Sequence, residues 1–125
     1  MLRLVALLSL LAVASCSSTQ GGSNAAKPST QGAGASVTLT DADRAAVEVA
    51  VRTRLADNAA TFRTMIAQRE ANGSVVVCGY VNPGTGDTPF YGHLSGQSFT
   101  LADIGGPTER TIAVQQACHG RGIYI

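Results

Sequence analysis

The chain has 125 residues, of which 45% are hydrophobic and 14% charged, and its formal net charge is +1. This length leaves room for one small domain after the N-terminal segments described below, and the sequence contains no internal repeats. The near-neutral charge excludes the basic stripe with which nucleic-acid-binding proteins displace phosphate counterions, so no nucleic-acid partner is expected.

The first residues have the three parts of an export signal. Arg3 supplies the basic start, the apolar run from Leu4 to Ala14 is interrupted only by Ser9, and small residues lead to a cysteine. A run of about 11 residues makes roughly 17 Å of helix, little more than half of the roughly 30 Å hydrocarbon core of a bilayer. The run is too short for a permanent membrane span, and residues 1–15 are therefore predicted to be a signal peptide.

The stretch Val13-Ala14-Ser15-Cys16 resembles the lipobox of bacterial lipoproteins, in which an apolar residue and two small residues precede an obligatory cysteine. In that family the cysteine becomes the mature N-terminus and carries diacylglycerol together with an acyl chain such as palmitate. The resemblance implies that Cys16 is lipidated, and two or more buried acyl chains give a stable membrane anchor. The alternative is a soluble secreted protein that is cleaved after the A-x-A pattern ending at Ala14.

The residue that follows Cys16 indicates where a lipoprotein would be sorted. It is Ser17 rather than Asp, which resembles the lipoproteins of the outer membrane. The resemblance implies a protein of the cell envelope that is attached to the outer membrane by its lipid and faces the periplasm.

Residues 16–37 are predicted to be the lipidated cysteine and a flexible linker. From Ser17 to about Ser36 the chain consists mainly of Ser, Thr, Gln, Gly, Asn and Ala, which cannot bury enough apolar surface to offset the ordering entropy. A coil of about 20 residues would hold the domain roughly 25 Å from its lipid. Residues 38–125 are then the folded domain.

A helix is predicted from Asp41 to about Ala56. Thr40 can cap its first free amides, and Asp41 and Asp43 complement the positive end of its dipole. Several alanines favour the helix over a strand, and its apolar positions recur at helical spacing: Val47, Val51 and Leu55.

Two strands are predicted to form a first hairpin. Residues 62–69 alternate as in a half-buried strand, and Asn72-Gly73 accepts the positive φ of a tight turn. The run from Ser74 to Val81 is rich in valine, so we expect it to be a central strand that pairs with residues 62–69.

A loop from Asn82 to Thr88 leads to a second predicted hairpin. Its strands are Pro89 to Leu94 and Ser98 to Leu101, joined by the turn Gly96-Gln97. A short helix is predicted from Thr108 to Cys118. This order of elements predicts an α+β fold, with an N-terminal helix packed on a small antiparallel sheet and a short C-terminal helix.

Cys78 and Cys118 form an even pair once Cys16 is assigned to the lipid. In an exported domain such a pair predicts a disulfide, and closing a loop of about 40 residues should stabilise the fold by roughly 4 kcal/mol. The competing interpretation is redox chemistry, but the C-x-x-C spacing that lowers a thiol pKa is absent. His93 and His119 provide too few ligands for zinc and lack a nucleophile elbow, so no metal, cofactor or catalytic residue is predicted.

Residues 77–82 read V-C-G-Y-V-N and are followed by Pro89-Phe90-Tyr91. They resemble a group of small uncharacterised bacterial exported proteins and lipoproteins, whose core reads V-C-G-x-V-N, then a Gly-rich loop, then a P-F pair. Leu55 to Phe62 is a shortened version, without the proline, of the L-x-D-P-x-S-A-x-F stretch that precedes the core in that group. The resemblance implies an exported α+β domain with a structural cysteine, and it implies no activity.

The first functional hypothesis is a non-enzymatic envelope lipoprotein that binds another envelope protein or a glycan. The predicted binding patch combines aromatic and polar side chains around two adjacent strands: Tyr80, Asn82, Phe90, Tyr91 and His93. The competing interpretation places Tyr80 and Phe90 in the core.

The second hypothesis is a small periplasmic enzyme or a thiol redox protein. It requires Cys78 to be free and activated rather than bonded to another cysteine. The number of free thiols in the folded domain separates the two hypotheses.

Overall fold

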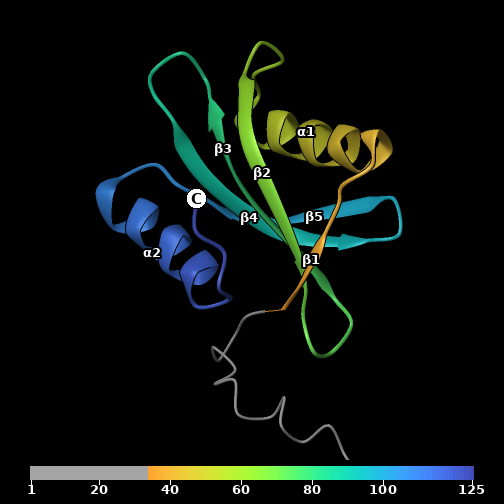
Figure 1. The fold of residues 1–125 in the computed structure, drawn as a ribbon. Coiled ribbons are helices and arrows are strands. Elements are labelled where there is room, and N and C mark those ends of the chain that lie inside the picture. Colours follow the sequence, from red (N-terminus) through yellow and green to blue (C-terminus); the bar gives the residue numbers. More distant parts are fainter. Residues whose placement is uncertain (1–33) are drawn as a thin grey trace, which may run out of the picture.

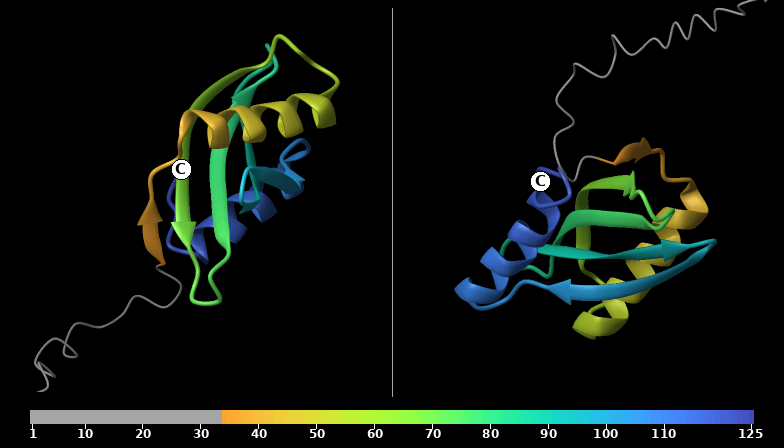
Figure 2. Two further views of the ribbon diagram at one scale, coloured as in Figure 1. Left: turned by 90° about the vertical axis from the view of Figure 1, so that its right-hand side faces the viewer. Right: turned by 90° about the horizontal axis from the view of Figure 1, so that it is seen from below.

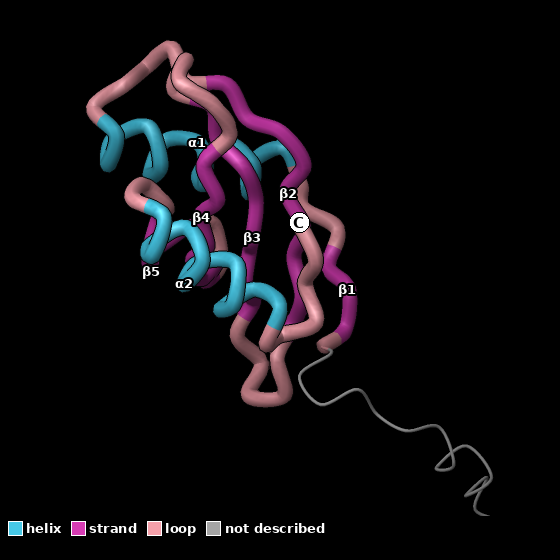
Figure 3. The backbone as a smooth tube through the Cα atoms, turned by 90° about the vertical axis from the view of Figure 1, so that its left-hand side faces the viewer, coloured by secondary structure: helices cyan, strands magenta, loops and turns pink. Residues whose placement is uncertain are grey.

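The computed structural model describes residues 34–125, which form a five-stranded antiparallel sheet and two helices (Figure 1). In chain order the elements are β1 (Ala35–Val37), α1 (Asp41–Leu55), β2 (Thr61–Arg69), β3 (Val75–Asn82), β4 (Thr88–Ser95), β5 (Ser98–Ile104) and α2 (Thr108–His119). The strand order is β1-β2-β3-β4-β5, so each strand pairs with its neighbours along the chain. The α1 and α2 helices lie on opposite sides of the sheet (Figure 3).

The predicted helix at residue 41 is present, and its first turn explains why it begins there. The backbone N–H of Asp43 donates to the Thr40 hydroxyl at 3.1 Å, and the Thr40 N–H donates to the Asp43 carboxylate at 2.9 Å. This capping box satisfies two amides that would otherwise lack partners. The helix ends at Leu55, and its C-cap residue Ala56 has a left-handed φ of 53° that turns the chain away. The helix crosses the strands, as Figure 2 shows.

The expectation that a helix is the first element of the domain is wrong, because β1 precedes α1. The sequence pattern assigns residues 35–37 to the linker, whereas they pair with the far end of β2, with Ala35 opposite Arg69 and Val37 opposite Ala67. In addition, the Gly34 N–H donates to the Gln68 side-chain oxygen at 3.1 Å. The predicted signal peptide, the predicted lipidation at Cys16 and most of the predicted linker lie outside the described residues.

The two predicted hairpins are confirmed, and β3 is the central strand. In the first hairpin, Arg69 lies opposite Val75, and Gly73 has the positive φ of 87° that its turn requires. In the second, Ser95 lies opposite Ser98, so the turn has two residues, Gly96 and Gln97. The predicted C-terminal helix is also confirmed as α2.

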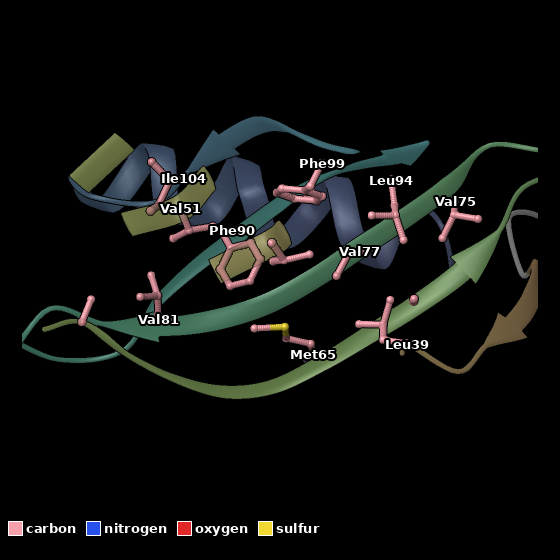
Figure 4. Close-up of a cluster of buried hydrophobic side chains, with 13 residues drawn as sticks. Leu39, Val51, Met65, Val75, Val77, Val81, Phe90, Leu94, Phe99 and Ile104 are labelled. Carbon is pink, nitrogen blue, oxygen red and sulfur yellow. The ribbon is translucent and has the colours of Figure 1, made fainter. Parts of the chain in front are cut away.

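The sheet buries apolar side chains on both faces, which is why β3 is apolar along most of its length. The first core lies between the sheet and α1 and contains thirteen buried residues (Figure 4): Leu39, Val47, Val51, Ala60, Met65, Ala67, Val75, Val77, Val81, Phe90, Leu94, Phe99 and Ile104. The second core lies on the other face and is much smaller: Val76, Cys78, Cys118 and Ile123. Among residues 34–125, no helix is long and apolar enough to cross a membrane.

Candidate functional site

The predicted disulfide is present between Cys78 in β3 and Cys118 in the last turn of α2. Their Cα atoms lie 6.2 Å apart, within the usual range for a disulfide, and both residues are fully buried. Ile66, Tyr91 and Ile125 pack partly buried around the bond. The bond therefore joins the central strand to α2 from within the second core.

Burial limits what the two sulfur atoms can do chemically. Thiol–disulfide exchange needs an attacking thiolate to reach one sulfur, and reactive cysteines lie in partly exposed sites. Since Cys78 and Cys118 are both fully buried, this arrangement favours a structural bond over a redox site.

The structure does not bring the five residues of the predicted binding patch together. Adjacent residues of a strand point to opposite faces. Phe90 belongs to the first core, whereas Tyr91 packs against the second. The Phe90 ring is fully buried and meets the Phe62 ring edge to face at a centroid distance of 6.0 Å. Phe90 is therefore a core residue, as the competing interpretation expects.

Tyr80 is half-buried, and its hydroxyl has partners in the C-terminal part of the chain. It accepts a hydrogen bond from the Gln115 side-chain nitrogen at 3.0 Å and lies 3.5 Å from the Ile125 carbonyl oxygen, to which it donates. These contacts attach α2 and the last residues to β3. Tyr80 is thus occupied by packing rather than free to bind a partner.

Asn82 organises the loop between β3 and β4. Its side-chain oxygen accepts from the Gly84 N–H at 2.7 Å, and its side-chain nitrogen donates to Asp87 at 3.2 Å. Arg63 of β2 forms an ion pair with the same carboxylate at 2.9 Å. The polar groups of the loop therefore bind one another.

Tyr91 and His93 lie near each other on the face of the sheet that α2 covers, the face on which Tyr80 also lies. Their ring centroids are 6.5 Å apart, and both side chains are half-buried. The Arg121 guanidinium lies 5.5 Å from the centre of the Tyr91 ring, and its Nε forms an ion pair with Glu70 at 2.9 Å. Sequence reasoning missed Arg121 and Glu70 at this place, because they are far apart in the chain.

A groove of about 400 Å³ lies where the tips of both hairpins meet β1 and the first turn of α1. Its lining mixes apolar, charged and backbone groups: Val37, Asp43, Arg69, Gly73, Ser74, Val75, His93, Leu94, Ser95 and Gly96. His93 is the one residue of the predicted patch that lines it. The part of the chain that the structure describes holds no cluster of three or more metal-ligating side chains.

Asp43 is a charged residue of the groove lining, and the hydrogen bonds of the helix cap lower its pKa. The backbone N–H of Thr40, and then its hydroxyl, donate to the carboxylate and hold the pKa of Asp43 below its ordinary value of 3.8. Arg69 donates to the Gly73 carbonyl oxygen at 3.1 Å. The lining of the groove therefore includes a carboxylate that stays ionised well below neutral pH, together with a guanidinium.

Comparison with known proteins gave no match: no family model, no curated protein and no solved structure is similar to this chain.

Proposed function

We propose that this chain is a bacterial lipoprotein of the cell envelope, anchored through Cys16, whose folded domain is a binding module rather than an enzyme. The observation that carries the proposal is the buried Cys78–Cys118 disulfide. Disulfides form and persist outside the reducing cytoplasm. The bond thus supports export, which the signal-like residues 1–15 and the lipobox ending at Cys16 also indicate.

Metabolic labelling with a radioactive fatty acid tests the anchor. Wild-type protein should carry the label, and Cys16→Ser should lose it, because only a thiol can form the thioether to diacylglycerol. Cys78→Ser/Cys118→Ser is the matched control, and it should keep the label. Undiminished labelling of Cys16→Ser would refute the lipoprotein assignment.

For the binding module we propose the groove at the hairpin tips as the contact surface for another envelope protein or a glycan. Its lining combines apolar side chains, which include Val75 and Leu94, with charged and polar groups. Pockets of mixed lining let apolar contact supply affinity while a few polar groups set orientation.

A pull-down from envelope extract with the intact lipoprotein tests this surface. We expect one enriched component, and we expect its recovery to fall at least tenfold with Arg69→Ala/His93→Ala, which corresponds to about 1.4 kcal/mol of binding free energy. Arg44→Ala, on the exposed part of α1, is the control. Equal recovery with the wild type and the groove variant would exclude the groove as the contact surface.

A further inference from the structure

The face of the sheet that carries the second core is closed by α2 and the residues that follow it. We call this unit, residues 108–125, the C-terminal cover. Only three of its residues are buried: Val114, Cys118 and Ile123. One of these three is a partner in the disulfide.

The helix of the cover has little stability of its own. It has 12 residues, and Pro107 at its N-cap makes no side-chain hydrogen bond. By contrast, α1 has 15 residues and a complete capping box. Isolated helices shorter than about 12–15 residues are marginal in water, so α2 depends on its contacts with the sheet.

The polar contacts between the cover and the sheet are few and partly exposed. They are three hydrogen bonds, Gln115–Tyr80 at 3.0 Å, Gln68–Gly122 at 3.3 Å and Tyr80–Ile125 at 3.5 Å, and two ion pairs, Arg110–Asp103 at 3.5 Å and Arg121–Glu70 at 2.9 Å. The side chains of the two ion pairs are between 28% and 52% exposed, and exposed pairs of this kind contribute little to stability.

The first core contains no residue of the cover. All thirteen of its buried residues come from α1, the strands and the connections that hold Leu39 and Ala60. Figure 4 shows these side chains gathered between the strands and α1. The two cores are therefore separate layers that share only the backbone of the sheet.

We propose that the C-terminal cover docks on the sheet only when the Cys78–Cys118 bond has formed, while the sheet and α1 fold without it. In the reduced protein Cys78 then lies in the middle of an uncovered sheet face, where an oxidising disulfide can reach it. Oxidation is therefore coupled to docking of the cover, and docking buries both sulfur atoms.

The coupled step balances with oxidised glutathione as the oxidant. The Cys78 thiolate attacks the disulfide of oxidised glutathione and forms a mixed disulfide between Cys78 and glutathione, and one glutathione thiolate leaves. The Cys118 thiolate then attacks the Cys78 sulfur, and the second glutathione thiolate leaves. The two cysteine protons end on two molecules of reduced glutathione, so two thiols are oxidised and one disulfide is reduced.

Hydrogen exchange tests the proposal. The protein used is the chain from residue 16 onward with Cys16→Ser, so that Cys78 and Cys118 are its two cysteines. In the oxidised protein, amides of α2 should be protected. In the dithiothreitol-reduced protein and in Cys78→Ala/Cys118→Ala, we expect residues 108–125 to exchange as an unstructured peptide does, while α1 and strands β2 to β4 stay protected. A protected cover without the bond, or loss of protection in all elements together, would overturn the proposal.

A second measurement uses the accessibility of one thiol. In the single variant Cys118→Ala, Cys78 should react with a maleimide nearly as fast as in the urea-unfolded protein, because the cover no longer shields it. Slow reaction in the folded variant would mean that the cover docks without the bond. Arg121→Ala, which keeps the disulfide, is the control, and its cover should stay protected. Loss of the cover there would assign its docking to the ion pair instead.

Discussion

At the scale of single residues, Gly92 in β4 has no room for a side chain. A Cβ atom there would overlap with the Phe99 ring and with the Thr100 carbonyl oxygen. We expect Gly92→Ala to lower the free energy of unfolding by about 1–3 kcal/mol, the usual effect of overpacking a core. Urea unfolding measures this. The control is Gly106→Ala, where a Cβ atom meets nothing within 4 Å. Equal stability of the two variants would contradict the close packing of Phe99 and Thr100 against Gly92.

The lowered pKa of Asp43 predicts that the stability of the fold depends on pH. Hydrogen bonds from the Thr40 backbone and hydroxyl lower its pKa below 3.8 in the folded protein. A carboxyl group with a lowered pKa stabilises the fold above its unfolded pKa and loses this contribution as the pH falls through the folded pKa. Wild type should therefore melt above Asp43→Asn at neutral pH, and the gap should close as the pH falls through 3.8 and below. Asp41→Asn, which lacks these hydrogen bonds, is the control, and a gap that does not change with pH would refute the assignment.

At the scale of elements, Ile123 and Ile112 provide a matched pair within the C-terminal cover. Ile123 is fully buried in the second core, whereas Ile112 on α2 is 47% exposed. In the oxidised protein, Ile123→Ala should lower the free energy of unfolding by about 2–5 kcal/mol, because it removes buried methyl groups and leaves a cavity. Ile112→Ala should change it far less. Similar losses in both variants, measured by thermal unfolding, would show that the second core is not packed as described.

The elements that could be predicted from the sequence are those with a local signal. The Thr40 cap defines the start of α1, the valine run of β3 marks a buried strand, and Asn72-Gly73 marks a turn. The β1 strand has no such signal. Its three residues are mostly exposed and are held by the edge of β2, more than 30 positions away in the chain. Pairing of this kind depends on the tertiary fold and is not visible in a short window of sequence.

The candidate site was predicted less well, for a physical reason. Closeness in sequence does not place strand residues on one face, because Phe90 and Tyr91 must point to opposite sides of the sheet. Whether a side chain of β4 faces α1 or α2 depends on the register of β4 with β3, in which Cys78 lies opposite Tyr91. The contact of Arg121 with Glu70 joins residues 51 positions apart. The disulfide could be predicted because it follows from an even number of cysteines in an exported domain, and this requires no knowledge of their positions in space.

At the scale of the whole molecule, the outer strand β5 carries features that oppose pairing with another chain. Among the described residues, β5 pairs only with β4, and this ladder is irregular at Tyr91 and Gly92. The Asp103 carboxylate also accepts a hydrogen bond from the Ile104 N–H at 2.8 Å. Bulges and charges at sheet edges prevent association. We expect a monomer in sedimentation velocity and self-association in Asp103→Val but not in the control Thr100→Val; association of the wild type would refute this role.

The two hydrogen bonds of the Gln68 side chain suggest that the chain can be joined at its present ends and opened elsewhere. The Gln68 side-chain oxygen accepts from the Gly34 N–H, and its side-chain nitrogen donates to the Gly122 carbonyl oxygen. Gly34 and Gly122 are therefore within reach of one side chain, and a glycine linker from Ile125 to Gly34 should close the domain into a ring. Opening that ring in the exposed loop of residues 84–87 would give a circular permutant. It should fold with the same disulfide, whereas a permutant that forms only mispaired or free thiols would show that folding requires the natural chain order.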